Sequence, residues 1–306
     1  MNITFEQAIE EYLKYSKMKK KYDTYETIER RIKKHILPFF NSKKLVDVSV
    51  KDYFEWQLFI EEKNFKYNYK SSLHYTFSDF YEYCYKFYGI KNIAKKIGNF
   101  KNDDVEEIGT IWTLKDFKKF ISNIDDNIYH ALFNLLYFTG LRKGEALALT
   151  FNDLNDNYLT INKTITRFKK NGKKIITAPK TKTSNRIISL DNMLIEELNN
   201  LKKYYQNNYT DFNNNFYIFG GNKEITFSTL LRKKNYYCDK ANVKRIKIHE
   251  LRHSHAILLY LNNVPIDQIS RRLGHSKISI TTDIYLKYVP IQEKKVLDIL
   301  NTLHSF

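Results

Sequence analysis

The sequence predicts a mainly α-helical protein with one small antiparallel β-sheet, organised as two domains. Apolar residues recur at helical spacing along most of the chain. Nine glycines and four prolines in 306 residues are far fewer than collagen-like chains or turn-dense all-β folds contain. A length of 306 residues is more typical of two domains than of one.

Residues 1–97 are predicted to form a bundle of four to five helices. A first helical pattern starts at Phe5 and is expected to end at Pro38, because proline lacks the N–H that an interior helical residue donates. A second pattern, with steps of four, three, four and three, puts five apolar side chains on one helical face: Leu73, Phe77, Phe80, Cys84 and Phe87.

Residues 98–111 lack strong periodicity and contain four acids, so they are predicted to link the two domains. A new helix is predicted to start after Thr113, which suits an N-cap because Asp116 follows three residues later. The next helix is expected to end at Gly140, and another is expected to begin near Arg142.

Three β-prone segments follow, and consecutive segments are separated by turn residues. They predict a three-stranded antiparallel meander over Tyr158–Thr166, Lys174–Ala178 and Arg186–Leu190. After Asp191 the helical pattern returns with Leu194 and Leu198 and continues to the end of the chain.

Cysteine content and hydropathy exclude several classes of protein. Two distant cysteines, Cys84 and Cys238, provide neither a disulfide framework nor a cysteine zinc site. The N-terminus has early acids and no apolar stretch of the kind found in signal peptides. The longest nearly apolar run, around residues 131–141, is shorter than the roughly 20 residues of a membrane span. We therefore expect a cytoplasmic protein that does not enter a membrane.

The charge balance predicts a polyanionic partner, above all nucleic acid. The chain has 51 Lys and Arg against 34 Asp and Glu, a formal net charge of +17. Two basic clusters, residues 163–186 and 232–247, suit contacts to a phosphate backbone. An AT-rich genome would also favour lysine, and 41 of the basic residues are lysines. The position of each of the ten arginines is correspondingly more informative.

Three short segments carry most of the functional information. They are Thr-Gly-Leu-Arg-Lys-Gly-Glu-Ala-Leu at 139–147, His-Glu-Leu-Arg-His at 249–253 and Leu-Gly-His-Ser at 273–276, with Tyr285 nine residues after the last. In this order they resemble the tyrosine recombinase (phage integrase) family of site-specific DNA recombinases. The resemblance assigns 112–290 to the catalytic domain and 1–97 to the helical, SAM-like core-binding domain, with 98–111 between them. It implies that the two domains close on DNA as a C-shaped clamp, without the extra arm-binding domain of lambda-type integrases.

The resemblance also implies the roles of the site residues. Tyr285 would attack a DNA phosphodiester and form a 3′-phosphotyrosine, and Arg142 and Arg252 would hold the charged phosphate with bidentate donors. His249 would assist proton transfer from the tyrosine, and His275 would hydrogen-bond the phosphate. The bond energy stays in the covalent link, so neither a metal nor another cofactor is expected.

A lysine in the hairpin before residue 186 would protonate the leaving 5′-oxygen, and both Lys180 and Lys182 suit that role. Glu145 lies three residues after Arg142 and is expected to orient its guanidinium. Tyr288 is the nearest alternative to Tyr285 as nucleophile.

The partners implied are double-stranded DNA recombination sites and three further copies of the chain, which act on two duplexes through a Holliday junction. An apolar stripe within residues 291–306 is expected to form a C-terminal helix that docks on a neighbouring protomer. An accessory DNA-bending or directionality protein is a further possible partner.

Three other functions remain open from the sequence alone. A type IB topoisomerase uses the same tyrosine chemistry, and a DNA-binding regulator could keep the fold without catalysis. The segment from His249 to His253 also satisfies the H-E-x-x-H pattern of zinc metalloproteases, in which the two histidines share a metal. The extended protease pattern is broken, since Ala256 and Leu259 stand where glycine and histidine are required.

Overall fold

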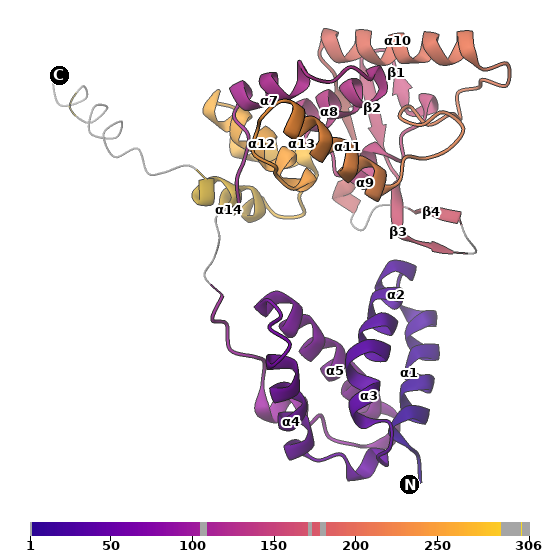
Figure 1. Cartoon of the computed structure of the whole chain (residues 1–306), viewed down its shortest axis with the longest axis vertical. Helices are drawn as coiled ribbons and strands as arrows, with labels where there is room; N and C mark the ends of the chain where they lie inside the picture. Colours follow the sequence, from indigo (N-terminus) through magenta and orange to yellow (C-terminus); the bar gives the residue numbers. More distant parts are fainter. Residues whose placement is uncertain (1, 105–108, 171–172, 178–181, 289–300, 302–306) are drawn as a thin grey trace. The chain divides into compact units, whose positions relative to one another are not determined.

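The computed structural model describes residues 2–104, 109–170, 173–177, 182–288 and 301 (Figure 1). The chain divides into two compact units, Met1–Glu107 and Ile108–Phe306. The structure is mostly helical with small antiparallel sheets, which confirms the predicted fold class. The C-terminal helix expected within residues 291–306 lies outside the described residues.

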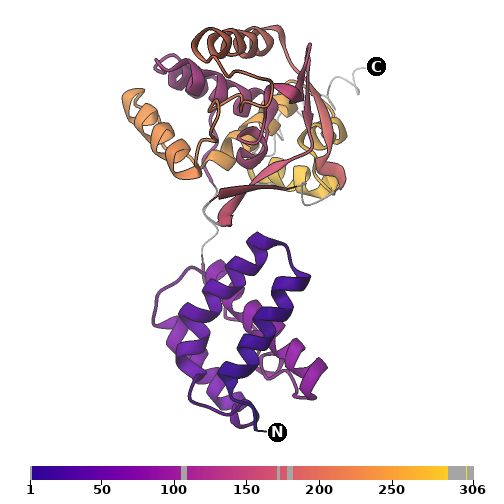
Figure 2. The same ribbon diagram turned by 90° about the vertical axis from the view of Figure 1, so that its right-hand side faces the viewer.

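The first unit is helical throughout its described part. In Figure 2 the first two helices run side by side in opposite directions. The elements in chain order are α1 (Phe5–Lys19), α2 (Tyr22–Arg31), the π-helical turn η1 (Ile32–Ile36), α3 (Leu37–Phe40), the 3-10 turn η2 (Leu45–Asp47), α4 (Val50–Glu61), α5 (Tyr67–Tyr88) and α6 (Ala94–Ile97).

Pro38 does not end the helical path, and this prediction was wrong. The chain widens into the π-helical turn η1 and starts α3 at Leu37, so Pro38 falls in the first turn of a new helix. A first-turn residue has no helical partner for its N–H, so the missing donor of proline has no cost there.

The long helix α5 carries the predicted apolar face. Leu73, Phe77, Phe80 and Cys84 are fully buried, but Phe87 is half exposed near the end of the helix. Phe77 lies at the centre of the core, with its ring 5.2 Å from that of Trp56 and 4.9 Å from that of Tyr81. The core of this unit is therefore built largely from aromatic rings.

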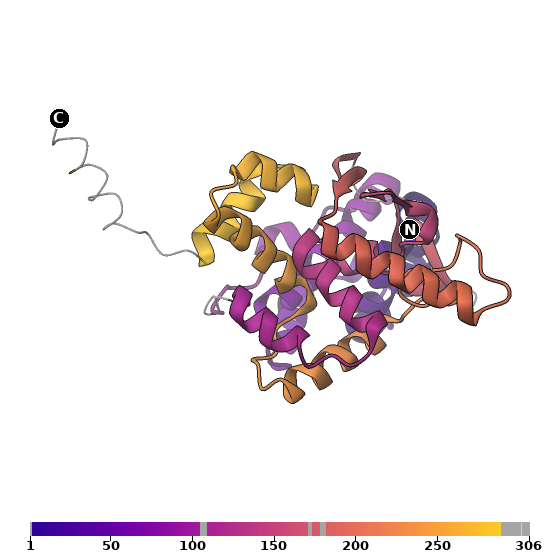
Figure 3. The same ribbon diagram turned by 90° about the horizontal axis from the view of Figure 1, so that it is seen from above.

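The second unit combines helices with two small sheets, and Figure 3 shows α8 and α10 lying side by side. Its elements are α7 (Leu114–Ile121), α8 (Asn127–Thr139), α9 (Lys143–Ala146), η3 (Phe151–Asp153), β1 (Leu154–Asn155), β2 (Tyr158–Ile161), β3 (Thr164–Lys170), β4 (Lys173–Thr177), η4 (Lys182–Ser184), β5 (Arg186–Ser189), α10 (Asn192–Asn208), α11 (Phe227–Lys240), α12 (Ile248–Leu261), α13 (Ile266–Leu273) and α14 (Ile278–Tyr288).

Capping residues in the sequence predicted these helix ends correctly. Thr113 and Asp116 form a capping box at the start of α7. The Asp191 side chain accepts a hydrogen bond from the backbone N–H of Leu194 at the start of α10. Gly140 ends α8 in the left-handed conformation, with φ +66°. Each of these ends depends on a few neighbouring residues, which is why sequence alone located them.

The predicted meander was wrong in its pairing. The segment expected as one strand over 158–166 is divided into β2 and β3, which belong to different sheets. Strand β2 lies between β1 and β5, with Leu159 opposite Ile188, whereas β3 and β4 form a separate two-stranded sheet among the described residues. The core-facing residues Leu159 and Ile188 are fully buried, so burial of the β2–β5 face favours this pairing over consecutive strands.

Within the described residues, no helix is both long and apolar enough to cross a membrane. Cys84 and Cys238 are buried free thiols in different units.

Candidate active site

Arg142 lies in the sharp turn between α8 and α9. A side chain at Gly140 would collide with its surroundings, since a Cβ there would lie 2.5 Å from Leu273 Cδ2 and 2.7 Å from His255 Cδ2. Glycine also tolerates the positive φ of this position. The chain therefore turns closely against α12 and α13, and Arg142 becomes the N-cap residue of α9 with about a third of its side chain exposed.

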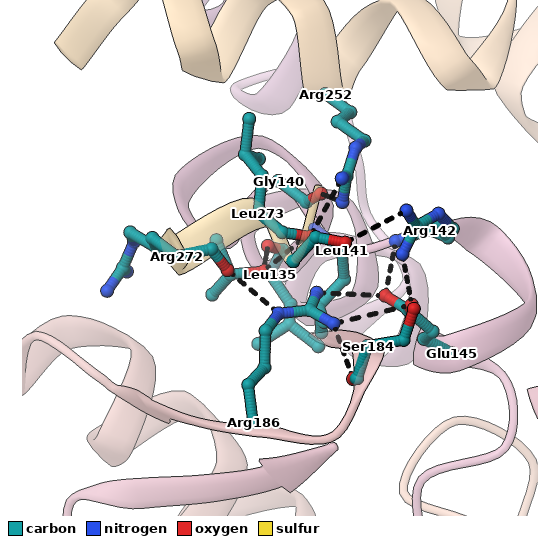
Figure 4. Close-up of polar contacts among 12 residues, drawn as sticks. Leu135, Gly140, Leu141, Arg142, Glu145, Ser184, Arg186, Arg252, Arg272 and Leu273 are labelled. Atoms are coloured by element: carbon teal, nitrogen blue, oxygen red, sulfur yellow. Dashed lines mark hydrogen bonds and ion pairs between the residues drawn. The ribbon is translucent and has the colours of Figure 1, made fainter. Parts of the chain in front are cut away.

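Arg252 lies on α12 and is almost fully buried, with 1% of its surface exposed. Its guanidinium donates hydrogen bonds to two backbone carbonyls, Gly140 O at 2.8 Å and Leu273 O at 2.7 Å (Figure 4). Burial, and then the positive charge of Arg142, lower its pKa to about 9. A buried cation held by carbonyls retains most of its charge for an anionic ligand.

One buried carboxylate, that of Glu145, binds both Arg142 and Arg186. Glu145 accepts a hydrogen bond from Arg142 Nη1 at 2.8 Å and another from the Arg142 backbone N–H at 3.0 Å. On its other side, Arg186 donates from Nη2 at 3.0 Å and from Nη1 at 3.4 Å. Burial alone would raise the pKa of Glu145, but Arg186 and Arg142 outweigh it and hold that pKa below its usual value. Glu145 therefore orients Arg142, as its spacing suggested.

His275 follows the turn at the end of α13. Its Nδ1 shares a hydrogen bond of 2.8 Å with Thr281 Oγ1, which fixes the ring and leaves Nε2 for a ligand. Burial, followed by the charges of Arg252 and Arg142, lowers the pKa of His275 to about 3. Gly274 has φ +71°, and a Cβ there would lie 2.9 Å from Thr183 O, so the turn packs tightly on η4.

His249 stands at the start of the helix that carries Arg252. The two residues are three positions apart, so their side chains share one face of α12. Burial, followed by the nearby His253 and Arg252, lowers the pKa of His249 to about 4. At neutral pH the imidazole is therefore uncharged and able to accept a proton.

The structure brings Arg142, Arg252, His249 and His275 into one electropositive region but leaves Tyr285 outside it. The ring of Tyr285 lies on that of Tyr260, with centroids 3.8 Å apart, and this hydrogen-bonded pair raises the pKa of Tyr260. Tyr260 is eleven residues beyond His249, about 16 Å along the helix. Within the described part of the chain, no hydrogen bond joins Tyr285 to the two arginines or two histidines.

Tyr288, the alternative nucleophile, lies closer to the histidines. Its ring centroid is 5.9 Å from that of His253, which is itself 4.8 Å from that of His249. Both tyrosines belong to α14, which immediately follows the turn of His275.

The two candidate lysines belong to the segment between β4 and β5, which is not a hairpin because these strands lie in different sheets. Lys180 lies outside the described residues, and so does the side chain of Lys182, whose backbone begins η4. Beside His249 the described residues form a cleft of about 1280 Å³, with Lys143, Arg167, Lys169 and Lys247 among its lining residues. Both basic clusters of the sequence thus contribute to one surface next to the site.

Glu250, the acid of the H-E-x-x-H pattern, has a structural contact. Glu250 accepts a hydrogen bond from the Lys247 backbone N–H at 2.5 Å and so caps α12. Among the described side chains, no group of three or more His, Cys, Asp or Glu residues is placed to hold a metal ion.

Arg186 was not among the candidate residues derived from the sequence, although it lies at the centre of the polar network (Figure 4). It is one of only ten arginines in a chain rich in lysine. That scarcity was the one available signal, because nothing in its immediate sequence shows that it meets Glu145, 41 residues away.

Comparison with known sequences gives matches in both units. Residues 112–289 match the phage integrase family, and residues 4–60 match the phage integrase N-terminal SAM-like domain. The ICEBs1 integrase of Bacillus subtilis (strain 168) is 32% identical over 203 residues, which are 63% of this chain and 54% of that protein. The chain therefore spans about half the length of the curated relatives that it matches.

Solved structures share the fold at low sequence identity. The Tn1549 transposon integrase in complex with circular intermediate DNA superimposes with a TM-score of 0.71 at 21% identity, covering 96% of this chain and 99% of that one. A lambda integrase tetramer bound to a Holliday junction gives a TM-score of 0.68 at 17% identity, covering 92% and 77%.

Proposed function

The chain belongs to the phage integrase family of tyrosine recombinases, and from this premise we propose that it cuts and rejoins double-stranded DNA at specific sites through a covalent phosphotyrosine at Tyr285. The observation that carries the proposal is the meeting of Arg142, Arg252, His249 and His275, which come from three separate stretches of the chain. Two guanidiniums and two neutral imidazoles in a largely buried site provide the charge and the proton acceptors that a reacting phosphodiester requires.

In the proposed reaction the Tyr285 oxygen bonds to phosphorus while the bond from phosphorus to the 5′-oxygen breaks. The phenol proton passes to His249, and a lysine of the segment between β4 and β5, Lys180 or Lys182, protonates the leaving oxygen. Arg142, Arg252 and His275 hold the non-bridging oxygens, on which negative charge increases. Tyr285 must leave Tyr260 to reach the phosphate, so DNA binding has to compensate for the loss of their ring contact.

We assign the domains in the same way. Residues 1–97 would act as the core-binding domain and 112–290 as the catalytic domain, joined through 98–111 and closing on DNA as a C-shaped clamp. Residues 291–306 would dock on a neighbouring protomer, which links four copies around two duplexes. The lambda integrase tetramer on a Holliday junction, which shares this fold, supports such an assembly. An accessory DNA-bending or directionality protein completes the expected partners.

Covalent trapping on DNA tests the proposal. Nicked duplexes tiled across the DNA that flanks the gene would be incubated with the wild type, Tyr285→Phe and Tyr288→Phe, and resolved on a denaturing gel. We expect a protein–DNA band with the wild type and Tyr288→Phe only. A band that persists in Tyr285→Phe and disappears in Tyr288→Phe would move the nucleophile to Tyr288.

Two further outcomes distinguish the alternative functions. Salt-sensitive binding to a duplex without any covalent product would favour a DNA-binding regulator. A covalent product with relaxation of supercoiled plasmid, but without strand exchange between two sites, would favour topoisomerase activity. Recombination between two copies of the trapped site would support the recombinase.

A further inference from the structure

Arg186 is the most highly connected side chain of the polar network, although no reactive role is assigned to it. All three of its guanidinium nitrogens donate hydrogen bonds, and 7% of its side chain is exposed. Besides Glu145, it reaches the carbonyl of Arg272 at 2.8 Å from Nε and the carbonyl of Ser184 at 3.0 Å from Nη1. Figure 4 shows these contacts converging on one guanidinium.

Each partner of Arg186 lies within three residues of a group to which the proposed function gives a role. Glu145 also binds Arg142, so this contact reaches the phosphate-binding arginine. The Arg272 carbonyl lies three residues before His275, at the end of α13. Ser184 is the last residue of η4, which begins at Lys182. Arg186 itself starts β5, where the chain returns from the lysine-bearing segment.

Local geometry is adapted to this contact. A Cβ on Gly274 would lie 3.0 Å from Arg186 Nη1, so only glycine lets the guanidinium approach the turn before His275 so closely. The remaining charges also require Arg186. Without Arg186, Glu145 would pair with Arg142 alone. The carboxylate would then neutralise more of the Arg142 charge, and the attraction of Arg142 for a phosphate would be weaker.

We propose that Arg186 is a positioning residue, which anchors η4, the turn that begins at Lys182, beside Arg142 and the turn of His275, so that protonation of the leaving 5′-oxygen depends on it. This inference rests on the proposed function. Arg186 touches no reacting atom. It fastens Ser184, at the end of η4, to the phosphate-binding side of the site.

The conservative variant Arg186→Lys separates this role from charge neutralisation. An ammonium group can still pair with Glu145, which preserves the charge balance around Arg142. A single nitrogen on a flexible stem cannot also reach the carbonyls of Ser184 and Arg272 in the directions that three guanidinium nitrogens do. The variant therefore keeps the ion pair and loses the anchor.

The leaving group provides the decisive measurement. The probe is the nicked duplex on which the wild type forms its covalent product, prepared with either oxygen or sulfur at the bridging 5′ position. A thiol has a pKa of about 8.5, far below that of an alcohol, so the sulfur leaves without receiving a proton. Single-turnover cleavage rates and duplex affinities would be measured for the wild type, Arg186→Lys and Arg271→Lys. Arg271 is an exposed arginine of α13 that pairs with Asp267 and serves as the matched control.

We expect Arg186→Lys to cleave the oxygen duplex about 10- to 100-fold more slowly than the wild type, with unchanged affinity. On the sulfur duplex its rate should return to within about threefold of the wild-type rate on the same duplex, because no proton is needed there. Arg271→Lys should match the wild type on both.

An equal loss on both duplexes, or no loss on either, would overturn the positioning role while leaving the proposed function intact. A general structural role would produce such an equal loss, together with a lower thermal midpoint. If the wild type forms no covalent product on any duplex, the proposed function fails first, and the inference fails with it.

Discussion

The two units of the chain bury different kinds of side chain. Among the described residues of Met1–Glu107, no Asp, Glu, Lys or Arg is buried, and the core consists mainly of aromatic and aliphatic groups. The described part of the second unit buries five charged residues: Glu145, Asp153, Lys234, Glu250 and Arg252. Burying a charge costs free energy unless partners compensate it. Glu145 and Arg252 belong to the candidate site, so the site carries a burial cost that the core of the first unit does not.

The largest expected effect tests this contrast at Arg252. We expect Arg252→Met to lower the cleavage rate about 10³-fold, because it removes the guanidinium that the proposed function assigns to the phosphate. The free energy of unfolding should change by less than about 1 kcal/mol, since the same change removes a buried cation that has no carboxylate partner within hydrogen-bonding distance among the described residues. Single-turnover cleavage and denaturant unfolding measure the two quantities.

A large loss of stability in Arg252→Met would contradict the view that buried charge is costly in the second unit. It would mean that leaving the carbonyls of Gly140 and Leu273 without a hydrogen-bond donor costs more free energy than removal of the buried charge gains.

The converse prediction concerns Phe77 in the first unit. We expect Phe77→Ala to lower the free energy of unfolding of this unit by about 3–4 kcal/mol, because it leaves a cavity beneath Trp56 and Tyr81. The two tryptophans, Trp56 and Trp112, lie in different units, so fluorescence in a Trp112→Phe background reports the first unit alone.

The control for Phe77 is Phe54→Ala on α4, where the ring is half exposed and a change of about 0.5 kcal/mol is expected. Equal losses from the two substitutions would show that the aromatic core does not dominate the stability of this unit.

The next effect in size concerns the buried ion pairs of Glu145. We expect Glu145→Gln to lower the free energy of unfolding of the second unit by about 3 kcal/mol, since it leaves Arg186 buried without a compensating charge. Asp267→Asn, which breaks the exposed pair with Arg271, should cost less than about 1 kcal/mol. Fluorescence of Trp112 in a Trp56→Phe background provides the measurement, and similar costs for both variants would contradict the role of burial.

The smallest expected effect is a pH dependence of the second unit. His275 has a pKa of about 3 in the folded protein, below the value of about 6.5 for an unfolded histidine. The unfolded state therefore binds the extra proton as the pH falls below about 6.5, and stability decreases from there toward the folded pKa. Allowing for solvent screening, we expect His275→Asn to remove about 1 kcal/mol of the stability lost between pH 7 and 5. An identical pH profile for the variant and the wild type would contradict this assignment.

Short-range features of the fold were predictable from the sequence. The N-caps at Thr113 and Asp191 and the left-handed end of α8 at Gly140 depend on residues within one turn of each other. Helical periodicity identified the buried face of α5, apart from Phe87 near its end. The motifs around Arg142, Arg252 and His275 led to the right family, because residue type and order are themselves sequence properties.

Tertiary structure alone decided what these residues meet. The β-prone segments had the right composition, but only burial of Leu159 against Ile188 selected β5 as the partner of β2. The convergence of Arg186 on Glu145, and the packing of Tyr285 on Tyr260 away from His249, join residues that are 25 to 41 positions apart. Helix caps and periodicity are determined by neighbours along the chain, whereas pairing and burial are determined by the free energy of desolvating groups that only the folded chain brings together.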